Sequence, residues 1–219
     1  MKPQIKICCI SSIEEAKMAI NHGASALGLV GEMPSGPGPI DDDLIQKIAK
    51  EIPPPIATFL LTSEKSGEAI LDHHKRTQTN TIQIVDRPDE GTHKYLQKEL
   101  PNVKRVQVIH VTGDNSIDEA LFYTEKADLL LLDSGNTNLD VKELGGTGRT
   151  HNWDISREIV KQSPIPVFLA GGLDADNVKK ALDTVQPFGI DVCSGVRTNG
   201  NLDPKKLKTF IKASGFSNI

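Results

Sequence analysis

Several residue types and patterns are scarce in this chain of 219 residues, and each scarcity excludes a class of protein. Aromatic residues make up 4% of the sequence and include a single Trp, which argues against a platform that stacks nucleic-acid bases. The net charge of -4 provides no basic surface for nucleic acid or an anionic membrane. No apolar run approaches the roughly 20 residues of a membrane span, and the N-terminus lacks the apolar segment of a signal peptide.

Cysteine is also rare, with three residues and no framework spacing, which predicts a reducing compartment and a soluble cytoplasmic protein. Two of the three, Cys8 and Cys9, are adjacent in the run QIKICCISS. A vicinal pair makes a poor structural disulfide and is too short for a zinc motif. Either both thiols pack in the core, or one of them is present for its chemistry.

Apolar segments typical of strands alternate with helix-like segments along the whole chain. The predicted strands cover 5–10, 26–31, 56–62, 81–86, 105–111, 128–133, 166–171 and 189–195. The predicted helices cover 12–23, 41–52, 66–74, 92–100, 116–127, 153–162, 174–185 and 203–213. Several helices open with Ser or Asp, which suits an N-cap.

Eight such units predict an α/β protein in which a parallel sheet closes as a (β/α)₈ TIM barrel. The whole chain, 1–219, is predicted to form one compact barrel domain, because no linker divides it. An open doubly wound sheet is the alternative, but it usually uses five or six strands, and no G-x-G-x-x-G follows the first strand.

In a barrel the cysteine pair would lie at the C-terminal end of the first strand. Active sites of such barrels lie at the C-terminal ends of the strands. Side chains alternate along a strand, so Cys9 is predicted to share a face with Ile5 and Ile7 and to pack outward. Cys8 shares a face with Lys6 and is predicted to point into the barrel mouth, where a thiol could react.

The sixth predicted strand ends in a carboxylate, Asp133, after four leucines. Such a group must be solvated at the mouth, hydrogen-bonded or kept neutral by a raised pKa. It could simply cap the following loop. Alternatively, Asp133 and Cys8 could form an acid and base couple for proton transfer across the mouth.

Glycine-rich loops follow the last three predicted strands, in LGGTGRTHNWD, LAGGLDADN and DVCSGVRTNG. Barrels commonly bind phosphate with the loops after strands seven and eight, where backbone N–H groups can approach an anion. The predicted donors are at Gly171, Gly172, Ser194 and Gly195.

These segments resemble those of the phosphoribosylanthranilate isomerase family of tryptophan biosynthesis. KICCIS is similar to the family's K-I-C-G-[IL]-T opening, and LLLLDSG with GGTGRTHNW is similar to its L-L-D and G-G-T-G-K-T-F-D-W segments. FLAGGLDADNV and GIDVCSGV are similar to its A-G-G-L-x-x-x-N-V and G-[VI]-D-V-S-S-G-V motifs. The resemblance runs from the first strand to the last helix.

The resemblance implies an Amadori rearrangement of N-(5-phosphoribosyl)anthranilate, in which Asp133 protonates the ring oxygen and Cys8 removes the C2 proton. It implies phosphate contacts from the three glycine loops, including the additional residues Gly145, Gly146 and Gly148. It implies no cofactor and no metal, and the lack of a His/Asp ligand cluster counts against a ribulose-phosphate epimerase. The expected partner is a small phosphorylated substrate, without nucleic acid or membrane, and both a monomer and a homodimer remain open.

Three departures from the family pattern bear on the aglycone. The second loop, EMPSGPGPI, lacks the Arg of the family's P-x-S-P-R, and QIVDRPDE puts Asp86 and Arg87 in place of a His-Gly. Arg197 replaces a family Glu and, like Arg87, could bind the substrate carboxylate or be a solvated loop arginine. Cys9 also replaces the glycine of the family's first-strand motif, K-I-C-G. The sequence therefore also allows a divergent paralogue acting on another phosphoribosyl amine or aldose phosphate, or a non-catalytic binding protein.

Overall fold

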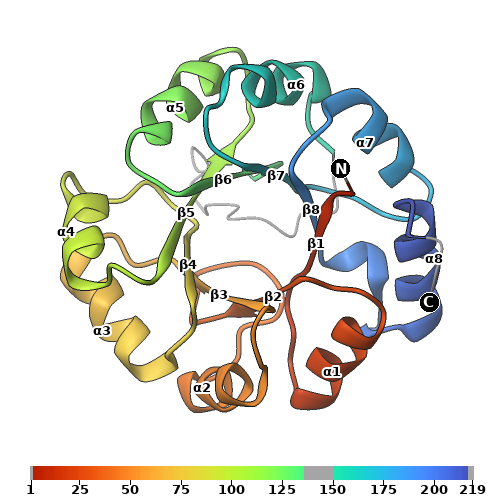
Figure 1. Cartoon of the computed structure of the whole chain (residues 1–219), viewed down its shortest axis with the longest axis horizontal. Coiled ribbons are helices and arrows are strands. Elements are labelled where there is room, and N and C mark those ends of the chain that lie inside the picture. Colours follow the sequence, from red (N-terminus) through yellow and green to blue (C-terminus); the bar gives the residue numbers. More distant parts are fainter. Residues whose placement is uncertain (1, 136–149, 217–219) are drawn as a thin grey trace.

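Eight parallel strands form a closed barrel surrounded by eight helices in the computed structural model, which describes residues 2–135 and 150–216 (Figure 1). The first strand pairs with both the second and the eighth, so the sheet has no free edge. This closure confirms the predicted (β/α)₈ barrel and excludes the open sheet. No described helix is long and apolar enough to cross a membrane.

The elements follow the predicted order. The strands are β1 (Gln4–Ile7), β2 (Ala26–Val30), β3 (Ala57–Thr62), β4 (Thr81–Ile84), β5 (Lys104–His110), β6 (Leu129–Asp133), β7 (Val167–Leu169) and β8 (Gly189–Val192). The helices are α1 (Ile13–Asn21), α2 (Asp42–Glu51), α3 (Gly67–Thr77), α4 (Thr92–Glu99), α5 (Asn115–Thr124), α6 (Trp153–Gln162), α7 (Val178–Val185) and α8 (Pro204–Ala213). A 3₁₀ turn, η1 (Ser194–Val196), and a hairpin of β9 (Arg197–Thr198) and β10 (Asn201–Leu202) follow β8.

Side-chain caps fix where several helices begin. The Ser12 side chain accepts a hydrogen bond from the Glu15 N–H, and Asp41 and Ser66 cap α2 and α3 in the same way. Asp203 accepts from two backbone N–H groups of α8, whose first residue is a proline. These oxygens satisfy donors that have no partner within the helix, so the predicted starts are correct to within a few residues.

Strand alternation divides the core into two layers. Ile5, Ile7 and Leu130 belong to the layer between strands and helices, which consists of one large cluster and a smaller one around β4, α3 and α4. Phe59 and Leu131 belong to the inner cluster that fills the barrel interior. Because the interior is filled, only the ends of the strands are available for a site.

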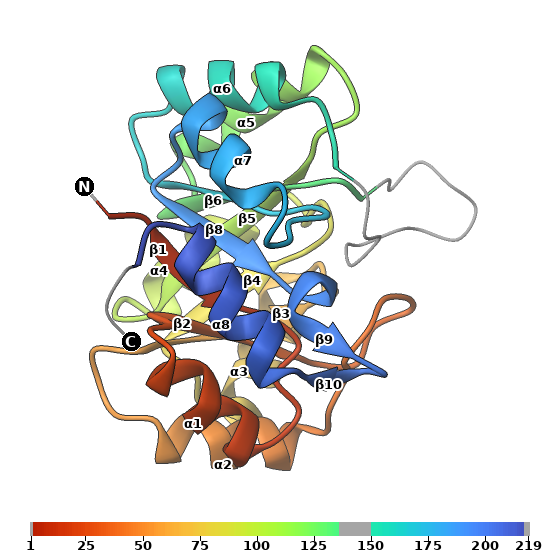
Figure 2. The same ribbon diagram turned by 90° about the vertical axis from the view of Figure 1, so that its right-hand side faces the viewer.

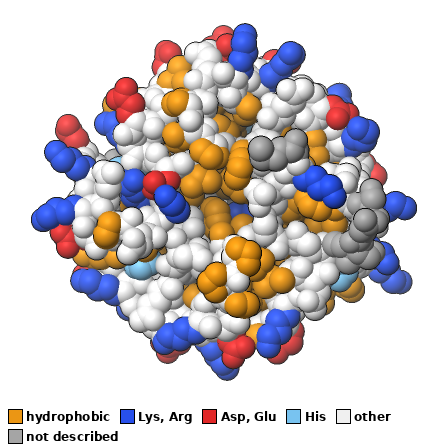
Figure 3. Space-filling view, in the orientation of Figure 1, with side chains coloured by type: hydrophobic (Ala, Val, Ile, Leu, Met, Phe, Trp, Pro, Cys, Tyr) orange, Lys and Arg blue, Asp and Glu red, His pale blue; other side chains and the backbone are white. Residues whose placement is uncertain are grey.

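The two ends of the barrel differ. Figure 2 shows both chain termini at one end, whereas β9, β10 and the C-terminal ends of the strands lie at the other. Figure 3 views the end near the termini, where apolar side chains gather over the barrel axis and charged ones lie around the rim. The functional groups predicted from the sequence belong to the opposite end, the mouth.

We expect Leu130→Ala to lower the free energy of unfolding by about 2–5 kcal/mol, because it leaves a cavity in a fully packed layer. Leu130 has no exposed surface in the layer between strands and helices. Urea denaturation of both proteins measures the difference. Phe122→Ala is the control, since Phe122 is 53% exposed and its removal should cost less than about 1 kcal/mol. Equal losses would contradict the two-layer description.

Candidate active site

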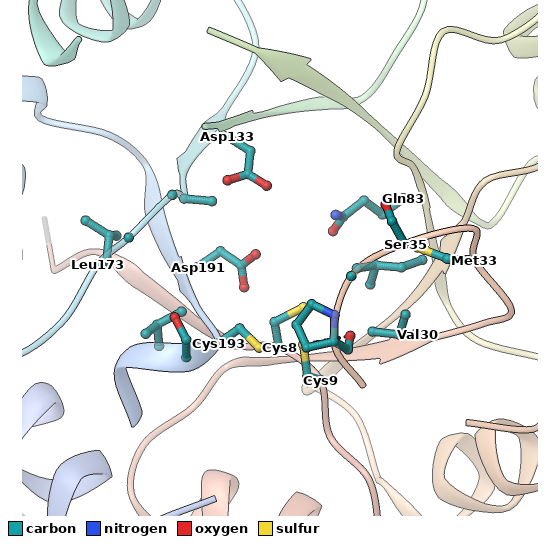
Figure 4. A pocket seen from close by; sticks show the side chains of 18 residues that line it. Cys8, Cys9, Val30, Met33, Ser35, Gln83, Asp133, Leu173, Asp191 and Cys193 are labelled. Atoms are coloured by element: carbon teal, nitrogen blue, oxygen red, sulfur yellow. Dashed lines mark hydrogen bonds between the residues drawn. The ribbon is translucent and has the colours of Figure 1, made fainter. Parts of the chain in front are cut away.

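A pocket opens at the mouth, at the C-terminal ends of the strands. It is lined by Cys8 after β1, Gln83 on β4, Asp133 on β6 and Asp191 on β8, and by the loops after β2 and β7. Figure 4 shows Cys8, Asp133, Asp191 and Gln83 around one opening. The structure thus brings together the thiol and the carboxylate that the sequence analysis paired.

Two groups point inward from consecutive inner positions, Lys6 on β1 and Cys8 directly after its end. Both lie against Gly28 of β2, where an added Cβ would come 2.7 Å from Cys8 Sγ and 3.1 Å from Lys6 Nζ. Because both atoms lie so close to one point, the ammonium and the thiol are neighbours. Only glycine leaves room for the two side chains at this position.

Cys9 does not pack outward, so that prediction is wrong. Strand β1 ends at Ile7, and Cys9 has a left-handed backbone with φ of 61°, which breaks the alternation on which the prediction rested. Cys9 belongs to the inner cluster with Cys8 and lines the same pocket. Its Sγ lies 3.5 Å from the carbonyl of Pro37, and its Cβ lies against Gly38 in the second loop.

A buried ion pair lies below the pocket. Lys6 Nζ is 3.0 Å from Asp191 Oδ1, and the lysine has no exposed surface. The two groups are close, although the contact is poorly directed for a hydrogen bond. Burial is the largest single effect and favours a neutral lysine, but Asp191 together with the thiols of Cys8 and Cys9 outweighs it and holds the pKa of Lys6 above its ordinary value. Burial also raises the pKa of Asp191, with Lys6 opposing it.

Asp133 ends β6 with its carboxyl group inside the pocket. Its Oδ1 accepts a hydrogen bond from the Ser134 N–H at 2.7 Å, so it caps the following turn as well as facing the pocket. Burial raises the pKa of Asp133, and the Ser134 hydrogen bond and nearby His110 only partly offset this effect. A protonated carboxyl can donate a proton to a ligand.

The Cys8 thiol is shifted in the opposite direction. A hydrogen bond from the Cys9 thiol lowers the pKa of Cys8, and the charge of Lys6 adds to this effect, against burial, which raises it. Hydrogen bonds with Cys193 and Cys8 raise the pKa of Cys9. Cys8 therefore tends toward the thiolate, the form in which it can accept a proton, while Cys9 keeps its own proton.

Glycine loops border the same pocket on the side of β7 and β8. Gly171, Gly172 and Ser194 line it, whereas Gly195 packs against the Leu173 carbonyl. The backbone N–H groups of Gly172, Ser194 and Gly195 donate to no acceptor among the described residues. They are available to an anionic ligand. Gly145, Gly146 and Gly148 lie outside the described residues.

Arg197 does not reach the pocket, which corrects its predicted role in substrate binding. It is 9% exposed, and its Nη2 lies 3.0 Å from Glu15 Oε2 in a buried ion pair. Both Nη groups also donate to backbone carbonyls, those of Cys8, Cys9 and Gly200. Arg197 is therefore absent from the described pocket lining and is not a solvated loop arginine, because both Nη groups are engaged by the protein and only its buried Nε has no partner among the described residues.

The other departures from the family pattern place no cation in the described pocket lining. Asp86 is buried and pairs with Lys65 at 3.4 Å, while Arg87 is exposed beside another cleft. The second loop contributes Met33, Ser35, Gly36 and Pro37 to the pocket. Among the described residues, no three His, Cys, Asp or Glu side chains are arranged to hold a metal ion.

Four functional candidates were not assigned from the sequence: Lys6, Gln83, His110 and Asp191. Gln83 Oε1 and His110 Nδ1 are buried at the mouth without a partner in the described part of the chain. His110 is the Cα partner of Asp133 across β5 and β6. Strand parity was the available signal, since all four residues lie on inward-facing positions near strand ends.

Comparisons with known proteins identify the family of the chain. The family model described as "N-(5'phosphoribosyl)anthranilate (PRA) isomerase" matches residues 5–213. An "N-(5'-phosphoribosyl)anthranilate isomerase 2" of Methanosarcina mazei is 36% identical, over 95% of this chain and 92% of the relative. One from Bacillus cereus is 31% identical, over 94% and 96%.

Solved structures show the same likeness. Phosphoribosyl anthranilate isomerase from Thermotoga maritima superposes with a TM-score of 0.81 and 28% identity, covering 97% of this chain and 98% of that one. A phosphoribosyl anthranilate isomerase bound to reduced 1-(o-carboxyphenylamino)-1-deoxyribulose 5-phosphate superposes at 0.78 with 27% identity and the same coverage. By its sequence and its fold, this chain belongs to the N-(5'-phosphoribosyl)anthranilate isomerase family.

Proposed function

We propose that this chain catalyses the Amadori rearrangement of N-(5'-phosphoribosyl)anthranilate, as its curated relatives are named to do. The observation that carries the proposal is the pairing of Cys8 and Asp133 in one pocket with opposite pKa shifts. A binding protein would need neither group in its shifted state. A solved relative with a reduced product analogue bound supports the same chemistry for the family.

The reaction needs one group that donates a proton and one that removes a proton. In the first step Asp133 donates its proton to the furanose ring oxygen, the C1–O bond breaks, and the anthranilate nitrogen forms a Schiff base to C1. In the second step the Cys8 thiolate removes the proton from C2, and the C2–H electrons neutralise the iminium. The enolamine then tautomerises to the ketose: C1 gains a proton, and the C2 hydroxyl loses one as it becomes the carbonyl.

Opposite pKa shifts matter because the active form holds a carboxylic acid and a thiolate together. With ordinary pKa values the carboxyl would lose its proton well before the thiol does. Burial of Asp133 and the neighbours of Cys8 bring the two values closer. The population that is ready for both steps therefore rises near neutral pH.

The phosphate of the substrate is proposed to bind at the loops after β7 and β8. The backbone N–H groups of Gly172, Ser194 and Gly195 point to such a site, since they donate to no described acceptor. Gly171 lines the pocket beside them. Gly145, Gly146 and Gly148 stay proposed phosphate ligands on the resemblance alone.

The cellular compartment is proposed to be the cytoplasm, because the three free thiols suit a reducing environment.

The second candidate function is isomerisation of another phosphoribosyl amine or aldose phosphate. It is favoured by one observation: the described lining of the pocket contains no Lys or Arg to bind the anthranilate carboxylate. Steady-state assays with phosphoribosylanthranilate test both functions. No turnover of that substrate, together with turnover of another phosphorylated aldose, would select the second.

Replacing the proposed base should abolish turnover. Cys8→Ala is expected to lower kcat by at least roughly two to four decades, since it removes the proposed acceptor of the C2 proton. Cys9→Ala, the matched control, should reduce kcat by less than about tenfold, because it only removes a hydrogen bond that stabilises the thiolate. Circular dichroism checks that both variants fold. Equal losses in two folded variants would refute the assignment of Cys8.

Asp133→Asn keeps the shape of the side chain and removes its transferable proton. We expect kcat to fall by roughly two to four decades while KM changes little, because the proton is needed in the transition state. The amide can still face the pocket, and its oxygen can still accept the hydrogen bond from the Ser134 N–H. A decrease of less than about threefold would mean that Asp133 only caps its loop.

Lys6 should control the ionisation of Cys8. Lys6→Met removes a cation that favours the thiolate, so the pKa of Cys8 should rise, and kcat at neutral pH should fall. Alkylation rates of Cys8 against pH, in a Cys9→Ala, Cys193→Ala background, measure the shift. Adding Asp191→Asn removes the unpaired buried charge if Lys6→Met alone is unstable. An unchanged alkylation profile in the folded variants would contradict the role of Lys6.

A further inference from the structure

The backbone just after β1 holds an unusual conformation at the residue next to the proposed base. Cys9 has φ of 61°, in the left-handed region that disfavours any residue with a Cβ. It is nonetheless 5% exposed and sits in the inner cluster beside Cys8. If the alternation of β1 continued, the side chain of Cys9 would face outward. A neighbouring interaction must therefore hold the Cys9 backbone in its observed conformation.

Arg197 provides that interaction from the hairpin after β8. Its Nη2 donates to the Cys8 carbonyl at 3.2 Å and, more closely, to the Cys9 carbonyl. The same guanidinium donates through Nη1 to Glu15 Oε1 at 3.1 Å and to the Gly200 carbonyl at 2.8 Å. One planar group therefore ties the Cys8–Cys9 backbone to two other elements.

Glu15 on α1 fixes the arginine in turn. Its Oε2 lies 3.0 Å from Arg197 Nη2, and it also accepts from the Ser11 N–H at 3.0 Å. Its Oε1 accepts from the Leu202 N–H at 2.7 Å. The carboxylate thus joins the backbone shortly after the cysteine pair to the hairpin that carries Arg197. Both charges are buried, and each compensates the other.

Two departures from the family pattern meet at this contact. Cys9 stands where the family has a glycine, which tolerates a positive φ, and Arg197 stands where the family has a glutamate. A glutamate could not donate to carbonyl oxygens, whereas the guanidinium can donate to several at once. A glycine would adopt this positive φ without support. With Cys9 in its place, the hydrogen bonds from Arg197 support the conformation.

We propose that Arg197 is a positioning residue for Cys8. Its guanidinium holds the carbonyls of Cys8 and Cys9, keeps Cys9 in the left-handed conformation, and so aims the Cys8 thiol into the pocket. The proposal rests on the proposed function in one respect, the use of Cys8 as the base. It concerns the backbone of the site and needs no contact between Arg197 and the substrate.

The test compares Arg197→Lys in two backgrounds, Cys9→Ala and Cys9→Gly, that differ by one methyl group at the strained position. Lysine keeps the charge opposite Glu15 but loses the planar fork. With Cys9→Ala we expect Arg197→Lys to lower kcat about tenfold or more, with KM changed less than about twofold. With Cys9→Gly the decrease in kcat should be less than about threefold, because glycine needs no support at this φ.

Arg105→Lys is the matched control. Arg105 is also buried, pairs with Asp128 at 2.9 Å and donates to the His93 carbonyl at 2.9 Å, but it lies near the start of β5, away from the mouth. The Arg105→Lys variant should have a lower melting temperature than its parent, without a large change in kcat. Equal decreases of kcat in the Cys9→Ala and Cys9→Gly backgrounds would overturn the proposal, as would a loss of stability alone.

Alkylation separates this proposal from the proposed function. Mass spectrometry follows the reaction of Cys8 with iodoacetamide, which requires no turnover, and Arg197→Lys should slow it in the Cys9→Ala background only. If the wild type does not isomerise phosphoribosylanthranilate, the proposed function fails, yet this difference still decides the role of Arg197. If Arg197→Lys fails to fold in both backgrounds, Glu15→Asp replaces it under the same comparison and the same criteria.

Discussion

The charge of Lys6 lies at the centre of the barrel, where the lysine has no exposed surface and Asp191 lies 3.0 Å away. A buried cation of this kind must be compensated by nearby anionic or polar groups. Three acids are placed to do so, Asp191, Cys8 and Asp133, and the charge of Lys6 favours the ionised form of each. One cation thus favours proton release from all three acids, and it links the acid and the base of the proposed reaction.

Much of this arrangement could be predicted from the sequence because barrels obey simple periodicities. The alternation of apolar strands and capped helices predicted eight units, and the structure closes them into one sheet. Strand parity placed Cys8 and Asp133 correctly at the mouth, since Asp133 is the last residue of β6 and Cys8 directly follows β1. The glycine loops after β7 and β8 were found for the same reason, through their position in the order of elements.

The rest could not be predicted because it depends on contacts between distant segments or on irregular backbone. Cys9 was misplaced because a single positive φ after Ile7 ends the alternation. Arg197 was misassigned because its partner, Glu15, is 182 residues away, and nothing in either local sequence indicates the pairing. Gln83 and His110 lay on the correct parity but could not be distinguished from ordinary polar residues without their buried, unpartnered atoms.

Loops at a barrel mouth are often treated as interchangeable modules on a fixed frame. Here the second loop is fitted to the first strand: Gly38 has φ of 82°, and a Cβ on it would lie 2.6 Å from the Cβ of Cys9. Residues 9 and 38 therefore cannot be changed independently of each other. A transplanted loop with any larger residue at this point would collide with Cys9, so that grafting a relative's loop demands a simultaneous change in the strand. The order in which such changes are made would decide which intermediates fold.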